Sequence, residues 1–93
     1  MTTCQVSICN QLGLHARAAA KFVHVANRFR SQVRVARENR SIDGKSIMGI
    51  LLLAAPCGAS ISITTDGPDE HDAITELCRL VASGFGEVHT WSA

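Results

Sequence analysis

The chain has 93 residues, of which 46% are hydrophobic and 4% aromatic, and its formal net charge is +1. This length predicts a single domain over residues 1–93, with a core of aliphatic side chains over about 3–87. The low net charge excludes a broad field for binding nucleic acid. The longest apolar stretch, 47–56, is too short to insert into a membrane.

The cysteines and the N-terminal stretch bear on cofactors and location. Cysteines at positions 4, 9, 57 and 78 form no CxxC pair and no metal-ligand spacing with the histidines, so we expect no metal and no cofactor. Polar residues interrupt the first strand, so we expect no signal peptide. A cytoplasmic protein with reduced thiols fits best, with all four cysteines as small buried hydrophobic residues.

Charged residues are unevenly distributed along the chain. Five acidic residues lie between positions 66 and 76, and five arginines cluster in the first half between positions 28 and 40. The arginines are Arg28, Arg30, Arg34, Arg37 and Arg40. Two interpretations are open, because this basic region either steers an acidic partner protein or forms an ordinary solvated rim.

The first half of the chain predicts a strand, a helix and a hairpin. Apolar and polar residues alternate over 4–9, as in a half-buried strand. From Ala16 the apolar spacing becomes i, i+3, i+4, i+7, which predicts a helix as far as Asn27 or Arg28. Alternation over 32–35 predicts a second strand, followed by a turn and a short return strand over 40–42.

The second half predicts a helix, a strand and a further helix. Ser46 is a natural N-cap for a short helix that ends near Leu53. Residues 60–64 alternate as a fourth strand. Pro68 suits the first turn of a last helix, whose apolar spacing continues as far as Phe85.

The predicted order of elements is β-α-β-β-α-β-α, followed by a patternless tail over 88–93 that we expect to be loosely held. Amphipathic helices and half-polar strands predict an α+β fold of two layers, with three helices on one face of a four-stranded antiparallel sheet. The first six elements also match a ferredoxin-like arrangement, so the periodicity leaves the strand order open.

His15 stands where a loop gives way to the first helix, directly before the N–H groups of Ala16, Arg17 and Ala18. Such groups have no partner within a helix, and with the positive end of the helix dipole they can hold a phosphoryl group. A neutral imidazole is a nucleophile near pH 7, and the Arg17 guanidinium can bind phosphate oxygens. The alternative is a plain histidine cap beside a solvent-facing arginine.

Ser46 marks a second candidate site. In the plainest interpretation it only caps its helix. That helix, however, contains more apolar residues than the buried face of two turns can hold, so an apolar surface that includes Met48 is expected to face solvent and to dock several partners. A phosphate on Ser46 would place negative charge beside this surface and repel an acidic partner.

Two segments, 13–17 (GLHAR) and 44–49 (GKSIMG), resemble the signature regions of the HPr family, the histidine-containing phosphocarriers of bacterial phosphoenolpyruvate-dependent phosphotransferase systems. The resemblance covers residues 3–87 approximately, and two motifs at the family's spacing make it specific. It implies an HPr-like open-faced β-sandwich with the strand order 1-4-2-3.

The resemblance also implies a role for each matching residue. His15 would accept a phosphoryl group on Nδ1 from Enzyme I and pass it to a histidine of an EIIA-type protein. Arg17 would stabilise the phosphate, and Ser46 would be the regulatory site of an HPr kinase/phosphorylase. The docking surface for these partners would consist of Ala16, Ala20, Lys21, His24, Asn27, Ile47, Met48 and Leu51. The family usually has proline in place of Ala18, so we expect a slightly less preorganised site with transfer retained.

We therefore expect a monomeric phosphoryl carrier rather than an enzyme. A second hypothesis is a regulatory binding module that acts through Ser46-controlled docking to a transcription factor or an enzyme, although His15 favours the carrier. A third hypothesis, a metal chaperone or a nucleic-acid binder, is disfavoured by the absence of CxxC and of exposed aromatic residues on the strands.

Overall fold

The computed structural model describes residues 1–86. The elements in this range are β1 (Thr2–Ser7), α1 (Ala16–Ala26), β2 (Gln32–Arg37), β3 (Arg40–Asp43), α2 (Ile47–Leu53), β4 (Ser60–Asp66), α3 (Glu70–Ala82) and a 3-10 turn, η1 (Gly84–Gly86). This succession confirms the predicted order β-α-β-β-α-β-α. The tail that we expected to be loose, 88–93, lies outside the described residues.

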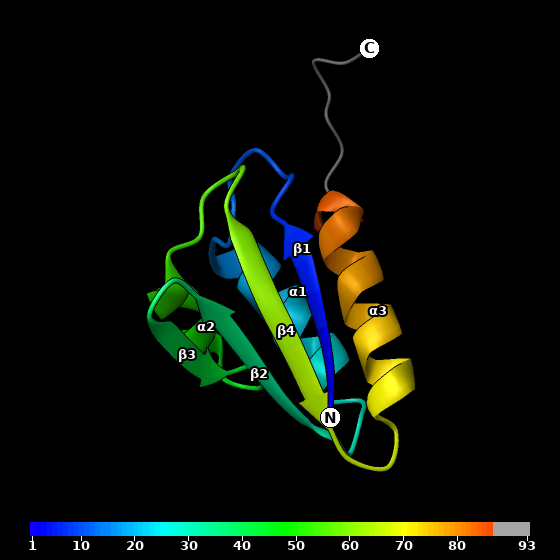
Figure 1. The fold of residues 1–93 in the computed structure, drawn as a ribbon. Coiled ribbons are helices and arrows are strands. Elements are labelled where there is room, and N and C mark those ends of the chain that lie inside the picture. Colours follow the sequence, from blue (N-terminus) through cyan, green and yellow to red (C-terminus); the bar gives the residue numbers. More distant parts are fainter. Residues whose placement is uncertain (87–93) are drawn as a thin grey trace.

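The four strands form one antiparallel sheet in the order β1-β4-β2-β3 (Figure 1). The last strand in the chain therefore lies between the first two, and Ile63 of β4 has Cys4 on one side and Val35 on the other. This arrangement settles the strand order that the periodicity left open. None of the helices in residues 1–86 has the length and apolar character that crossing a bilayer requires.

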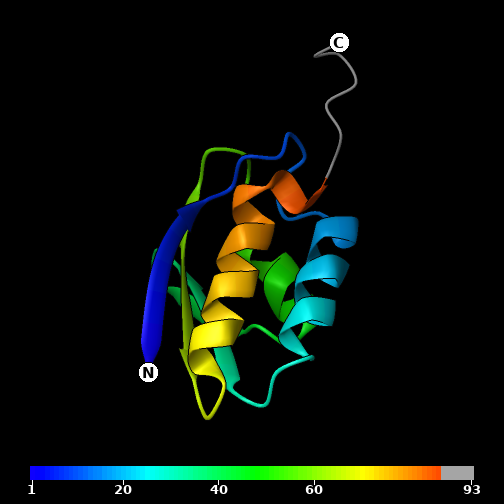
Figure 2. The ribbon, with the colours of Figure 1, turned by 90° about the vertical axis from the view of Figure 1, so that its right-hand side faces the viewer.

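All three α-helices cover the same face of the sheet (Figure 2). Phe22 of α1, Ile50 of α2 and Leu77 of α3 are each at most 1% exposed, and they share one core with Val35 and Ile63 of the sheet. Burying an aliphatic or aromatic side chain of this size stabilises the fold by about 1.5–3 kcal/mol. The opposite face is open, as predicted, because the alternate side chains of the strands are polar.

The end of α3 differs from the prediction. The helix begins at Glu70, so Pro68 precedes it, and it ends at Ala82 rather than near Phe85. Phe85 is fully buried, as its spacing indicated, but its φ of +60° is left-handed, and the φ of Gly84 is +70°. Left-handed residues cannot continue an α-helix, so Phe85 enters the core from a turn.

The cysteines also require a correction. Cys4 of β1 and Cys78 of α3 form a disulfide that joins the edge strand to the helix packed against it. Cys9 and Cys57 are free and exposed. The prediction of reduced thiols was therefore wrong for Cys4 and Cys78, whereas Cys9 and Cys57 are free as predicted but exposed rather than buried. The bonded residues lie 74 positions apart, and only the tertiary fold brings them together.

Two carboxylates fix the start of α3. Asp69 accepts hydrogen bonds from the hydroxyl of Ser31 and from the N–H groups of Arg30 and Ser31, each N–H bond being 2.9 Å long. The Ser31 hydroxyl is the largest cause that lowers the pKa of Asp69 to about 2. The ammonium group of Met1, 2.8 Å from the carboxylate of Glu70, is the largest cause that lowers the pKa of Glu70 to about 2. Both carboxylates are therefore bound in their charged form.

Candidate functional site

The loop between β1 and α1 is held from two sides before it reaches His15. The carbonyl of Gly13 accepts hydrogen bonds from Nδ2 of the buried Asn10 (2.8 Å) and from the N–H of His15 (2.9 Å). The N–H of Leu14 donates to the carbonyl of Ala55 (3.0 Å), in the segment after α2. Gly13 has a φ of +68°, and a Cβ there would lie 2.5 Å from that same carbonyl oxygen. Only glycine fits such a position without a shift of the backbone.

His15 is the N-cap residue of α1, as the change of spacing at Ala16 predicted. Its backbone is extended, with a φ of −82° and a ψ of −178°, and its carbonyl accepts from the N–H of Ala19 (2.8 Å). The residue is partly exposed, and its imidazole makes no capping hydrogen bond to the helix. The imidazole therefore does not serve as the side-chain cap of α1, although His15 occupies the N-cap position.

The start of α1 favours a negatively charged group. Its first turn contains no acidic side chain, and the first N–H groups of any α-helix have no partner within the helix. Arg17 is exposed in this turn. Ala18 buries its side chain completely, yet it keeps the N–H donor that proline lacks. The positive end of the helix dipole and the positive charge of Arg17 therefore both lie at the start of α1, next to His15.

The residues predicted to dock partners lie on two helices that pack against each other, α1 and α2 (Figure 2). The exposed ones are Ala16, Ala20, His24 and Asn27 of the first helix and its end, and Ile47 and Met48 of the second. Lys21 and Leu51 are half-buried. Leu52, which we did not single out, is 59% exposed, and Met48 is 68% exposed. The predicted apolar surface on the short helix is thus confirmed.

Lys21 has a contact that its position did not predict. Its Nζ donates to the carbonyl of Phe85 at 2.7 Å, which ties α1 to the turn after α3. The side chain is therefore ordered by the fold at the edge of the predicted docking surface.

Ser46 caps α2, as predicted. Its Oγ accepts from the N–H of Gly49 (3.1 Å), and its carbonyl accepts from the N–H of Ile50 (3.0 Å). The residue is half-buried. Its hydroxyl therefore lies at the start of the helix that carries Ile47 and Met48.

The sequence analysis did not identify the residues whose hydrogen bonds hold the loop before His15. An asparagine three positions before a glycine is a turn signal that could have identified Asn10. The Ala55 carbonyl has no sequence signal at all. The two interpretations of the basic region also did not include a contact of Arg37 and Arg40 with α2, whose last carbonyl groups both guanidinium groups bind.

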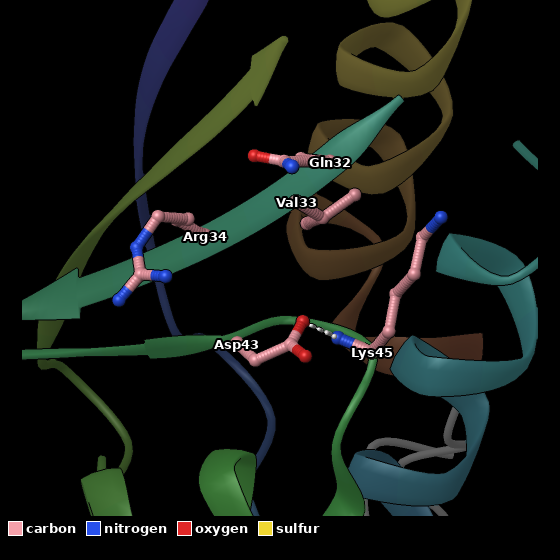
Figure 3. Close-up of a pocket in the computed structure, with 5 residues that line it drawn as sticks. All are labelled: Gln32, Val33, Arg34, Asp43 and Lys45. Carbon is pink, nitrogen blue, oxygen red and sulfur yellow. Dashed lines mark hydrogen bonds between the residues drawn. The ribbon is translucent and has the colours of Figure 1, made fainter. Parts of the chain in front are cut away.

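A hollow of about 260 Å³ lies elsewhere, at the start of β2 and the end of β3 (Figure 3). Its lining residues are Gln32, Val33, Arg34, Asp43 and Lys45. Figure 3 shows Lys45 extended away from Arg34, and its Nζ donates to the carbonyl of Phe29 (2.8 Å). Within residues 1–86, no cluster of three or more His, Cys, Asp or Glu side chains could hold a metal ion.

The model of the PTS HPr component phosphorylation site matches residues 2–83. The chain belongs to the HPr family. It is 51% identical to the phosphocarrier protein HPr of Cupriavidus necator, over 87% of this chain and 91% of that protein. It is 48% identical to HPr of Pseudomonas aeruginosa, over 94% of this chain and 98% of that protein.

Solved HPr structures have the same fold. HPr-C-His from Thermoanaerobacter tengcongensis has a TM-score of 0.91 and 42% identity, over 95% of this chain and 99% of that one. HPr from Bacillus anthracis has a TM-score of 0.83 and 39% identity, over 86% of this chain and 95% of that one. This HPr protein is a phosphoryl carrier of the phosphotransferase system, and the predicted open-faced sandwich is confirmed.

Proposed function

We propose that His15 carries the phosphoryl group, receiving it from Enzyme I and passing it to an EIIA-type protein. The observation that supports this most directly is the position of the partly exposed His15 at the N-cap of α1, directly before the first-turn N–H groups and the exposed Arg17. The lone pair of Nδ1 forms a bond to phosphorus while the bond between phosphorus and the donor breaks, and the donor keeps that electron pair. Transfer to the acceptor repeats these changes, with His15 as the group that leaves.

Arg17 and the helix start would hold the phosphate between the two transfers. A guanidinium group offers two parallel donors to phosphate oxygens, and the N–H groups of Ala16, Arg17 and Ala18 add backbone donors at the positive end of the dipole. The Arg17→Gln variant should therefore transfer at least about tenfold more slowly.

The direct test is phosphorylation by phosphoenolpyruvate and catalytic amounts of Enzyme I. The native chain should take up one acid-labile phosphate, and His15→Ala should take up none. His71→Ala is the matched control, because His71 is exposed on α3, outside the predicted docking surface, and it should be labelled fully. Labelling of His15→Ala would overturn the proposal.

The exposed apolar residues of α2 are proposed to contact Enzyme I and EIIA. Met48→Asp puts a charge on this surface and should raise the KM for phosphorylation about tenfold, with little change in kcat. Gln5→Asp puts the same charge on the open face of the sheet and should leave both values unchanged. Equal effects of the two variants would contradict this docking surface.

Phosphorylation of Ser46 by an HPr kinase/phosphorylase is proposed to weaken that docking. A phosphate adds a charge of about −1.5 to −2 beside Ile47 and Met48. Ser46→Asp introduces part of this negative charge. Ser46→Asn is the control, because asparagine has the same shape as aspartate but no charge. We expect a raised KM only for the aspartate. A kinase that cannot modify Ser46, or unchanged transfer in both variants, would remove this switch.

A regulatory module is the second candidate function. The chain is 36% identical to Crh, the catabolite repression HPr of Bacillus subtilis, with a TM-score of 0.74. His15 nevertheless supports carriage as the main role. We further propose that the protein acts in the cytoplasm, catalyses no reaction of its own and is a monomer.

The proposed monomer can be tested in solution. One solved relative is described as an HPr dimer, from Thermoanaerobacter tengcongensis. Light scattering after gel filtration should give a mass near 10.0 kDa for this chain. Twice that mass would favour a dimer like that of the relative.

A further inference from the structure

The short helix α2 is held at its C-terminal end by two arginine side chains from the β2–β3 hairpin. Nη1 of Arg37 donates to the carbonyl of Leu53 (3.1 Å), and Nη1 of Arg40 donates to the carbonyl of Leu52 (2.7 Å). Both carbonyls belong to the last turn, where an α-helix has no backbone donors of its own. The positive charge of each guanidinium also complements the negative end of the helix dipole.

The pairing of Arg37 with Arg40 is unfavourable for the hairpin by itself, and contacts with α2 offset this. The two residues lie directly opposite each other in the β2–β3 register. Like charges in such a cross-strand position oppose the pairing of the strands. Carbonyl groups at the negative end of α2 relieve that repulsion, so the two arginines and the helix end stabilise each other.

The segment that follows this clamp supports the loop before His15. Ala54 ends α2 in the left-handed region, with a φ of +50°. The next residue, Ala55, accepts the hydrogen bond from the N–H of Leu14 (3.0 Å). Only Ala54 therefore separates Leu53, whose carbonyl Arg37 binds, from Ala55, whose carbonyl holds the loop before His15. A displacement of the helix end moves both the exposed residues of α2 and the support of Leu14.

We infer that Arg37 and Arg40 are positioning residues for phosphoryl transfer, because they fix the C-terminal end of α2 and, through Ala55, the loop that carries His15. The inference rests on the proposed function of His15 and α2. Neither arginine touches the phosphoryl group. They set the relative position of the docking helix and the nucleophile, which must both meet the same partner.

The test compares the double variant Arg37→Gln/Arg40→Gln with the control Arg34→Gln. Arg34 lies on the same hairpin, but its guanidinium group binds Ser41 and not α2. We measure KM and kcat for phosphorylation by phosphoenolpyruvate-charged Enzyme I, and hydrogen exchange of the Leu14 amide relative to core amides. The double variant should raise KM three- to tenfold, change kcat less than twofold and speed exchange at Leu14 at least about fivefold. The control should match the native chain.

A third variant keeps the inference testable if the glutamine variant folds poorly. Arg37→Lys/Arg40→Lys keeps both charges and one donor group on each side chain, and should restore at least half of the lost kcat/KM. Unchanged KM and unchanged exchange at Leu14 in the double variant would overturn the inference, as would an equal rise in KM in Arg34→Gln. If the native chain is not phosphorylated at all, the proposed function fails, while exchange at Leu14 still tests the clamp.

Discussion

The amide of Leu14 is bound to the carbonyl of Ala55 at 3.0 Å, so the residue before His15 is anchored to the segment that leaves α2. These two positions are 41 residues apart in sequence: Leu14 belongs to the first signature segment (13–17), and Ala55 follows the second (44–49) by six residues. The loop before His15 and the segment after α2 are thus parts of one hydrogen-bonded unit. The loop before His15, which lies between β1 and α1, is therefore held by a hydrogen bond to a distant segment of the chain.

Gly13→Ala should damage this unit severely. A methyl group at position 13 would need a left-handed φ and would meet the Ala55 oxygen at 2.5 Å, whereas Gly86 has a φ of +70° with nothing within 4 Å of its Cβ position. We expect Gly86→Ala to lower the free energy of unfolding by about 1 kcal/mol and Gly13→Ala by about 3 kcal/mol or more. Urea unfolding of both variants measures the difference. Equal losses would mean that backbone strain alone matters at position 13.

Ser46→Ala should lower the free energy of unfolding by about 1 kcal/mol, because the N–H of Gly49 loses its acceptor. Ser46→Asn keeps an acceptor at the N-cap and should stay within about 0.5 kcal/mol of the native chain. The measurement is the midpoint of denaturant unfolding, compared between variants whose free energy of unfolding depends on denaturant with the same slope. If Ser46→Ala leaves the free energy of unfolding unchanged, the hydroxyl serves only as a modification site and not as a cap.

Stability should depend on pH through the start of α3. The folded state lowers the pKa of Asp69 from 3.8 and that of Glu70 from 4.5, each to about 2. Because the unfolded chain binds protons more readily, this contribution is complete above about pH 5 and is lost as the pH falls toward about 2. Asp69→Asn should flatten the profile in that window, and Asp72→Asn, an exposed change in the same turn, should not. Unfolding midpoints measured from pH 7 to pH 2 provide the check.

Reduction should destabilise the protein through Cys4 and Cys78. Their disulfide spans a sequence separation of 74 residues, and closing a loop of that size stabilises the folded state by about 4 kcal/mol. Melting with and without dithiothreitol should show the loss, and Cys4→Ser/Cys78→Ser should melt like the reduced chain in both conditions. A thiol titration of the unfolded native chain should count the thiols of Cys9 and Cys57 before reduction and all four afterwards. Four reactive thiols from the outset would disprove the bond.

Local patterns predicted most of the fold because they report which face of an element is buried. The change of spacing at Ala16 located the helix start and hence His15, and the excess of apolar residues after Ser46 predicted the exposed Met48. Phe85 shows the limit of this reasoning. Its burial follows the helical spacing, but the left-handed backbone that delivers it to the core depends on tertiary packing.

The supporting contacts of the site could not be predicted for a different reason. Arg37 and Arg40 bind backbone carbonyl groups, which every residue possesses, so no residue type in α2 marks them as acceptors. The Cys4–Cys78 bond depends on how α3 packs on β1, and the strand order depends on β4 reaching the centre of the sheet. Periodicity contains none of this long-range information.

The central place of β4 has a consequence for biosynthesis. Both β1 and β2 pair with β4, whose first residue, Ser60, is made 53 residues after the end of β1 at Ser7. A ribosome that adds about 5–20 residues per second needs about 3–10 s to bridge that interval. During this time β1 lacks the strand that pairs with it in the folded sheet. Chaperone capture of the emerging polypeptide would therefore be most valuable before the middle of the sheet has been translated.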